Sequence, residues 1–180
     1  MGKRILIVVD MQNDFIDGSL GTKEAVQIVP NVAAKIASYE KDTVFATLDT
    51  HPDNYLETAE GQKLPVAHCI KGTEGHKIAP SIAQALAQCS DCTYVEKPTF
   101  GSIDLMGHIQ HILETDTIDS IELCGLCTDI CVVSNTLLLK ALCPDIPIQV
   151  DGACCAGVTP ATHQAALTTM SMCQIDMINH

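Results

Sequence analysis

The feature that most constrains the fold of this chain is a regular alternation of strand and helix patterns along its 180 residues. Residues 5–9 (ILIVV) are apolar without interruption, as in strands that a parallel sheet buries on both faces. The same criteria place further strands at residues 43–48, 93–95, 120–124, 146–150 and 175–178, and helices at residues 26–39, 78–87, 105–113, 129–142 and 160–173.

Repeated strand–helix units imply right-handed crossovers, and therefore a parallel sheet between two layers of helices. We expect an α/β fold, a single-domain doubly wound sandwich spanning residues 1–180. Its mostly parallel sheet of about five to six strands has helices on both faces. Residues 50–77 have no clear periodicity, and loops of that length inside compact domains usually carry function.

The composition excludes several classes of partner. The formal net charge is −12, from 22 acidic and 10 basic residues, and the basic residues form no cluster. Nucleic acid and anionic membrane surfaces both require such a cluster, so neither is expected as a partner. No apolar run approaches the ~20 residues of a membrane-spanning helix. Several of the ten cysteines lie inside apolar patterns, as free thiols do in a reducing compartment, which favours a cytoplasmic protein.

Polar residues follow four of the predicted strands. Asp10 ends the first strand, Asp49 and Lys97 follow the second and third, and a loop ending at Cys131 follows the fourth. The carboxyl ends of parallel strands share one edge of the sheet, and ligands bind there. Either Asp10 or Lys97 alone would more often be a turn residue or a surface charge. Together, a carboxylate, an ammonium group and a thiol suit nucleophilic catalysis, in which the cation stabilises a thiolate and the carboxylate takes its proton.

Cys131 is the candidate nucleophile. Thr128 or Asp129 is expected to cap the helix that begins here, which puts Cys131 in the first helical turn. Unpaired N–H groups and the helix dipole favour a thiolate there, and such settings lower a cysteine pKa from about 8.5 to roughly 3.5–7.5. A buried structural cysteine is the alternative interpretation.

These residues lie in motifs that resemble the isochorismatase-like cysteine hydrolases, and most closely their nicotinamidase/pyrazinamidase branch. The matching segments, in the family's order and at the predicted strand ends, are residues 9–15 (VDMQNDF), 96–100 (EKPTF) and 125–131 (GLCTDIC). The resemblance implies that Asp10 is the catalytic base, Lys97 the catalytic lysine and Cys131 the nucleophile. It also implies a cis peptide bond between Leu126 and Cys127, which turns the N–H of Cys127 toward the oxyanion. The N–H of Cys131 completes the implied oxyanion hole.

Asp49, His51 and His68 are the candidate metal ligands. A carboxylate and two imidazoles suit Zn²⁺, although spacing alone favours surface histidines in a polar loop. The resemblance implies instead that the three residues bind a divalent metal, with Zn²⁺ as the expected ion. Residues 67–73 (AHCIKGT) resemble the second ligand motif of the nicotinamidase branch. The implied role of the metal is to hold the ring nitrogen of a pyridine or pyrazine carboxamide, which orients the amide toward Cys131.

The activity implied by the resemblance is hydrolysis of nicotinamide to nicotinate and ammonia, through a thioester on Cys131. Phe15, Leu126 and Phe100 are the expected substrate-binding residues. The branch usually has a tryptophan just before the second ligand motif. This chain has Leu64-Pro65 at that place and contains no tryptophan. Another small amide is therefore an alternative substrate, and an isochorismatase-type reaction or a non-catalytic small-molecule-binding protein are further alternatives. The resemblance also implies a homo-oligomer.

Two Cys-x-x-Cys pairs, Cys89/Cys92 and Cys124/Cys127, suggest a competing interpretation as a structural zinc site or a redox site. Residues 93–123 separate the pairs, which is longer than the ~15–20 residues of common zinc modules. Cys124 also ends a predicted buried strand. Metal binding by the two histidines is therefore favoured over a Cys₄ site.

Overall fold

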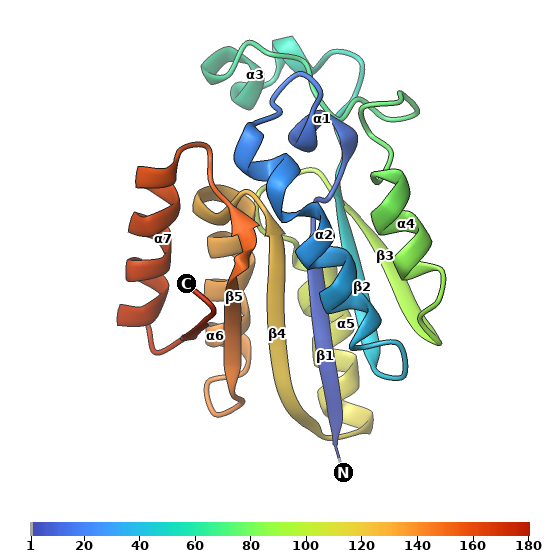
Figure 1. Cartoon of the computed structure of the whole chain (residues 1–180), viewed down its shortest axis with the longest axis vertical. Coiled ribbons are helices and arrows are strands. Elements are labelled where there is room, and N and C mark those ends of the chain that lie inside the picture. Colours follow the sequence, from blue (N-terminus) through green and yellow to red (C-terminus); the bar gives the residue numbers. More distant parts are fainter. Residues whose placement is uncertain (1) are drawn as a thin grey trace.

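The strands form one sheet, ordered β3-β2-β1-β4-β5-β6, in a computed structural model that describes residues 2–180 (Figure 1). Every pair of neighbouring strands is parallel, which confirms the predicted α/β fold with its mostly parallel sheet. The strands are β1 (Lys3–Val9), β2 (Thr43–Asp49), β3 (Asp91–Lys97), β4 (Ile118–Leu126), β5 (Ile148–Ala156) and β6 (Asp176–Ile178).

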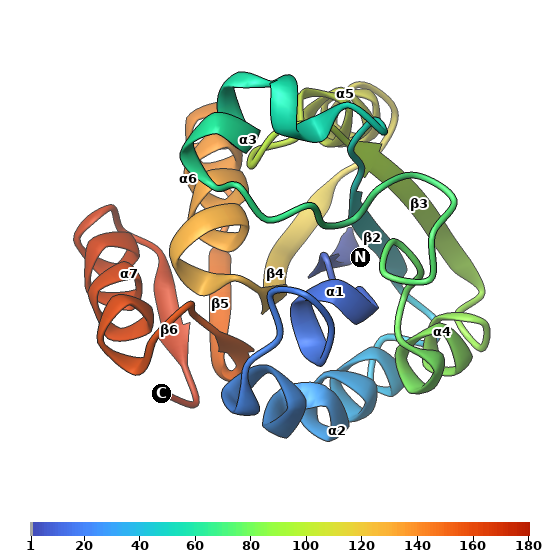
Figure 2. The same ribbon diagram turned by 90° about the horizontal axis from the view of Figure 1, so that it is seen from above.

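Helices cover both faces of this sheet, as predicted (Figures 1 and 2). One face carries α2 (Lys23–Ala37) and α4 (Pro80–Leu86), and the other carries α5 (Ile103–Thr115), α6 (Val133–Leu142) and α7 (Pro160–Met172). This division follows from right-handed crossovers, because the chain moves outward in one direction from β1 to β3 and in the other from β4 to β6. No helix within residues 2–180 has both the length and the apolar character that crossing a membrane requires.

Local sequence explains where the longer helices begin and which face they bury. The side chains of Thr22, Ser102 and Thr159 each accept a hydrogen bond from the backbone N–H three residues later, and so cap α2, α5 and α7. The buried face of α2 has apolar residues at intervals of three or four, namely Ala25, Ile28, Val32 and Ile36. The central strand β1 buries both faces from Ile5 to Val9, which is why its sequence lacks polar alternation.

The strand order reverses between the neighbouring strands β1 and β4, and ligands of doubly wound sheets bind at such a point. Gly125, which pairs with Val9, has φ +117°, and a Cβ at this position would lie 2.1 Å from the carbonyl oxygen of Val9. Glycine therefore lets the carboxyl end of β4 approach β1 closely. The loops that follow these two strands emerge side by side as a result.

The structure differs from the predicted elements mainly around the site. The helix expected at residues 129–142 begins as a π-helical segment, η2 (Thr128–Val132), before α6. The carbonyl of Cys127 accepts hydrogen bonds from the N–H groups of both Ile130 and Val132, which widens this first turn. The aperiodic stretch contains two short helices, η1 (Tyr55–Glu57) and α3 (Ala59–Lys63), above the carboxyl ends of the strands (Figure 1). A further short helix, α1 (Asn13–Ile16), follows β1.

Candidate active site

Asp10, Lys97 and Cys131 meet at the carboxyl edge of the sheet. The Nζ atom of Lys97 lies 2.7 Å from Oδ2 of Asp10 and donates a hydrogen bond to Sγ of Cys131 at 3.3 Å. All three side chains are buried. The three groups that the sequence singled out therefore meet around the Nζ atom of Lys97, although Asp10 directly follows β1 while Lys97 and Cys131 lie in β3 and η2.

Asp10 turns sharply out of β1, with φ +47°, a conformation that aspartate tolerates better than most residues. The hydroxyl of Thr47 donates a hydrogen bond to Oδ1 of Asp10 at 2.6 Å, while Oδ2 faces Lys97. Burial raises the pKa of Asp10, and the positive charge of Lys97 opposes this rise. The carboxylate is thus fixed in orientation and has a greater affinity for a proton than an exposed aspartate.

Lys97 connects the catalytic candidates to the metal-binding candidates. Its Nζ atom also lies 3.3 Å from Oδ1 of Asp49 and donates to the carbonyl oxygen of Thr99 at 3.2 Å. Burial would lower the pKa of Lys97, but the negative charges of the neighbouring carboxylates, Asp10 foremost and then Asp49, hold it above its usual range. Lys97 is therefore a buried ammonium group that faces two carboxylates and one sulfur.

The expected lowering of the Cys131 pKa is wrong for the resting site. Burial, and then the negative charge of Asp10, raise the pKa of this thiol well above its ordinary value, and Lys97 only partly offsets them. The helix start favours a thiolate, but desolvation outweighs it for a side chain with 4% exposure. The resting proton therefore resides on sulfur, next to a carboxylate that can accept it.

The loop before Cys131 contains the cis peptide bond between Leu126 and Cys127 that the resemblance implied. Cys127 is the N-cap residue of η2, and both Cys127 and Cys131 line the same cavity. Two further bonds hold the loop against the start of α7. The hydroxyl of Thr128 lies 2.8 Å from Nδ1 of His163, and the Asp129 carboxylate accepts the N–H of Val158.

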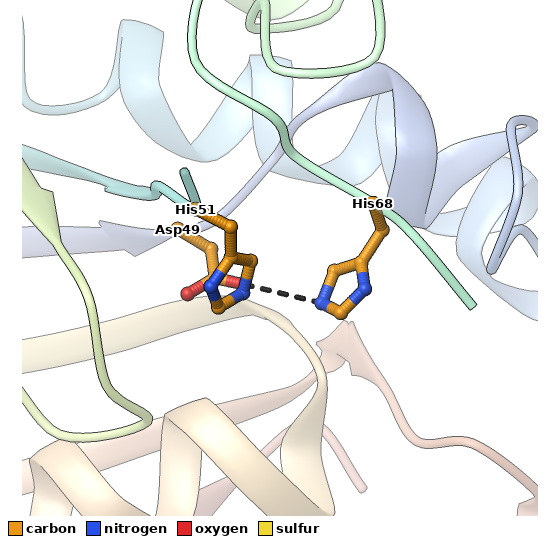
Figure 3. A group of neighbouring side chains, drawn as sticks. All are labelled: Asp49, His51 and His68. Atoms are coloured by element: carbon orange, nitrogen blue, oxygen red, sulfur yellow. Dashed lines mark hydrogen bonds and ion pairs between the residues drawn. The ribbon is translucent and has the colours of Figure 1, made fainter. Parts of the chain in front are cut away.

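Asp49, His51 and His68 form a second buried cluster, in which the three side chains point toward one another (Figure 3). Oδ2 of Asp49 lies 2.9 Å from Nε2 of His51 and 3.5 Å from Nε2 of His68, and the candidate ligand atoms are all within 4.8 Å of one another. Nδ1 of His68 contacts the carbonyl oxygen of Val66 at 2.8 Å. Because a carbonyl only accepts, Nδ1 must carry a proton, so Nε2, which faces Asp49, is the atom that would bind a metal.

This donor set fits a divalent metal ion. A carboxylate and two imidazole nitrogens are ligands that Zn²⁺ prefers, and their burial with few other partners favours ion binding. Burial opposes ionisation of Asp49, but hydrogen bonds from the two histidines and the charge of Lys97 hold its pKa well below its usual range. Within residues 2–180, no comparable group involves Cys89, Cys92 or Cys124.

Two residues of the site, Glu60 and Gln12, were not among the predicted site residues. Oε1 of Glu60, in α3, lies 3.7 Å from Nε2 of His51 and 3.9 Å from Nε2 of His68. Gln12 accepts the N–H of Asp49 at 2.8 Å and donates to the carbonyl oxygens of Asp49 and His76, at 2.9 and 2.8 Å. A lone glutamate in an aperiodic loop carries no signal in the sequence. The glutamine lies inside the motif that contains Asp10, which was its only indication.

The same motif also supports the second histidine. Asp14 accepts the N–H of Cys69 at 2.8 Å, beside His68. The ring of Phe15 packs edge-on against the ring of His68, with centroids 5.5 Å apart. The segment that follows β1 therefore provides Asp10, and its other side chains support two of the candidate metal ligands, Asp49 and His68.

A cavity of about 180 Å³ joins the two clusters. The predicted substrate-binding residues Phe15, Leu126 and Phe100 all line it, and Leu64 stands on its wall. The polar side chains Asp49, Glu60 and His68 also face the cavity, whereas the other walls are largely apolar. No lysine or arginine lines the cavity in the part of the chain that the structure describes. The remaining lining residues are Leu20, Thr22, Ala25, Cys127, Ile130, Cys131, Gly157 and Val158.

The sheet and its reversal point define a doubly wound α/β protein, with a strand-end cavity beside a cluster of cysteine, lysine and aspartate. The chain belongs to the isochorismatase family, whose domain model matches residues 4–180.

Similar proteins match over almost the whole chain. The nicotinamidase/pyrazinamidase of Mycobacterium tuberculosis is 26% identical over 190 residues, which cover 97% of this chain and 98% of that protein. The crystal structure of a nicotinamidase/pyrazinamidase from Bacillus subtilis has a TM-score of 0.84 at 24% identity and covers 98% of this chain and 99% of its own. A pyrazinamidase of Pyrococcus horikoshii, in complex with zinc, has a TM-score of 0.80 at 23% identity and covers 99% of both chains. These two structures establish a shared fold.

Proposed function

We propose that this protein is a cysteine-dependent amidohydrolase that converts nicotinamide to nicotinate and ammonia. The observation that carries the proposal is the position of Lys97, whose ammonium group contacts Asp10, Cys131 and Asp49 together. Through these contacts Lys97 links two residues that line the cavity, the proposed nucleophile Cys131 and the metal-ligand candidate Asp49, to the proposed proton acceptor Asp10. The whole-length similarity to a nicotinamidase/pyrazinamidase supports the choice of substrate.

In the proposed mechanism, Asp10 accepts the proton of Cys131, and Lys97 stabilises the thiolate that results. The thiolate attacks the amide carbon, and the N–H groups of Cys127 and Cys131 stabilise the oxyanion. Asp10 returns the proton to the nitrogen, so that ammonia leaves and a thioester remains on Cys131. Water then donates a proton to Asp10 and attacks the thioester. As the C–S bond breaks, Asp10 returns this proton to sulfur, which restores the thiol, and the nicotinic acid that is released ionises to nicotinate.

We propose that Asp49, His51 and His68 hold a divalent ion, with Zn²⁺ as the preferred ion. The ion would supply an electron-pair acceptor for the ring nitrogen of the substrate. The zinc complex of the pyrazinamidase from Pyrococcus horikoshii supports this choice. Phe15, Leu126 and Phe100, which line the cavity, would contact the apolar ring of the substrate.

The charge of the cavity argues against an isochorismatase-type reaction. Isochorismate carries two carboxylates, and sites for such groups use arginine or lysine. Of the residues from 2 to 180, neither a lysine nor an arginine lines the cavity. A purely binding function is also disfavoured, because burying Lys97 between two carboxylates and a thiol carries a desolvation penalty that binding alone does not require.

An ammonia-release assay tests the proposal directly. We expect turnover of nicotinamide and pyrazinamide and much slower turnover of aliphatic amides, because an aliphatic amide lacks the ring nitrogen and the flat apolar surface. Prior treatment with a chelator should abolish turnover, and added Zn²⁺ should restore it. Equal rates on aliphatic amides, or full activity in protein shown to be metal-free, would contradict the proposed role of the metal cluster.

Metal binding is expected to depend on the histidine cluster and not on the cysteine pairs. The double variant His51→Ala/His68→Ala should bind no divalent metal under conditions in which the parent protein binds one equivalent, because only Asp49 remains. The double variant Cys89→Ser/Cys92→Ser is the matched control and should bind metal normally. Elemental analysis after dialysis provides the measurement, and the opposite pattern would move the metal site to the cysteines.

We further propose that the protein acts in the cytoplasm and self-associates. The location is supported by the cysteines, which are all free thiols, as expected in a reducing compartment. The proposal of self-association rests on the family resemblance.

A further inference from the structure

Asn135 makes three hydrogen bonds that link the nucleophile to the loop after β3. Its Nδ2 group donates to the carbonyl oxygen of Cys131 at 2.8 Å and to the carbonyl oxygen of Phe100 at 3.1 Å. Its Oδ1 atom accepts the N–H of Ser102 at 2.9 Å. The side chain is fully buried in the first turn of α6. Both amide protons and the amide oxygen are therefore used, and all three partners are main-chain groups.

The loop that Asn135 holds is itself part of the site. The carbonyl of Thr99, in this loop, accepts a hydrogen bond from Nζ of Lys97. Phe100 lines the cavity, and Ser102 caps α5. A Cβ at Gly101 would lie 2.6 Å from Cδ1 of Leu138, so this loop packs directly on α6. Displacement of the loop would therefore move a partner of Lys97 and a wall of the cavity together.

We propose that Asn135 is a positioning residue, which sets the place of Cys131 relative to Lys97 by joining the main chain of the nucleophile to the loop after β3. The effect on turnover rests on the proposed amidase activity. Without the amide donors, the main-chain carbonyls of Cys131 and Phe100 both lose this buried hydrogen-bond partner. A shift of about 1 Å at a reacting group can lower a rate about 10²-fold.

The variants Asn135→Asp and Asn135→Ala test this proposal. Asp has nearly the same size and still accepts the N–H of Ser102, but it presents no amide donors to the two carbonyls. We expect kcat to fall by about 10- to 100-fold in both variants, with KM changed by less than about threefold. We also expect iodoacetamide to alkylate Cys131 about tenfold more slowly, as quantified by peptide mass spectrometry, because Lys97 no longer favours the thiolate.

Thr136→Val is the matched control. Thr136 is the next residue of α6 and is equally buried, but its hydroxyl donates only to the carbonyl of Val132 within the helix. Its kcat and alkylation rate should stay within about twofold of the parent protein, even where its midpoint of thermal unfolding falls. All variants are assayed well below their own unfolding midpoints.

Several outcomes would overturn the proposal. These are a folded Asn135→Asp variant with parental kcat and alkylation rate, a change confined to KM, or an equal loss in Thr136→Val. If neither Asn135 variant folded, Asn135 would be needed for folding, and the proposal that it positions Cys131 would be overturned. If the parent protein released no ammonia from nicotinamide, the proposed function would fail, but slower alkylation in the Asn135 variants would still support positioning.

Discussion

Replacing Cys131 with alanine is expected to lower kcat for ammonia release from nicotinamide by at least ~10⁴-fold. The reason is that the variant has no atom that can form the thioester, while the cavity and the metal cluster remain. Cys131→Ser should retain little activity, because a hydroxyl with a still higher pKa replaces the thiol in the same buried position. Steady-state kinetics and mass spectrometry of a trapped acyl-enzyme provide the measurements.

Cys143→Ala is a suitable control for this substitution. Cys143 is also a buried thiol, at the opposite end of α6, and it contacts neither cluster described above. Its kcat should remain within about twofold of the parent value, although removal of buried sulfur is expected to lower stability by roughly 1 kcal/mol. Comparable activity in Cys131→Ala and Cys143→Ala would refute covalent catalysis.

Lys97→Met is expected to damage both activity and stability. Methionine has a similar length but no charge, so Asp10 and Asp49 lose their shared buried cation. Breaking a buried ion pair by removing one partner typically lowers the free energy of unfolding by roughly 3–5 kcal/mol. We expect kcat to fall about 10²- to 10³-fold as well, because the thiolate loses its stabilising charge. Urea unfolding and ammonia release provide the two measurements.

The stability loss in Lys97→Met should depend on pH. Burial already raises the pKa of Asp10, and the substitution removes the charge that opposed this rise. The folded variant then binds a proton more tightly than the unfolded chain, so its stability falls as the pH rises through the raised pKa of Asp10. The loss should be full above that pKa and smaller below it.

Lys71→Met provides the matched control, because the Lys71 side chain is 66% exposed and pairs only with the exposed Glu96. Its unfolding free energy should change by less than about 0.5 kcal/mol. Equal stability of the two methionine variants would mean that the buried ion pairs of Lys97 contribute nothing to folding.

Helices and strands with a clear apolar periodicity were predictable from the sequence. The residues that support the site, such as Glu60, Gln12 and Asn135, were not. The uninterrupted apolar run of β1 and the helical spacing of α2 indicated their types directly, although their ends shifted by up to a few residues. The apolar spacing predicts a helix here, but it does not distinguish the π-helical turn at Thr128–Val132 from an ordinary helix start. The lowered pKa expected for Cys131 was wrong, because sequence contains no measure of desolvation.

The sequence by itself determined the order of strands and helices and which polar residues end the strands, because both are written in local patterns of polarity. It also pointed to Asp10, Lys97 and Cys131, since parallel strands bring their carboxyl ends to one edge. Only the tertiary structure decided that Lys97 contacts Asp10, Cys131 and Asp49 together, that Glu60 approaches the histidines, and that Asn135 joins the nucleophile to the loop after β3. Such contacts join residues far apart in the chain, and their distances and burial depend on packing, which no local pattern encodes.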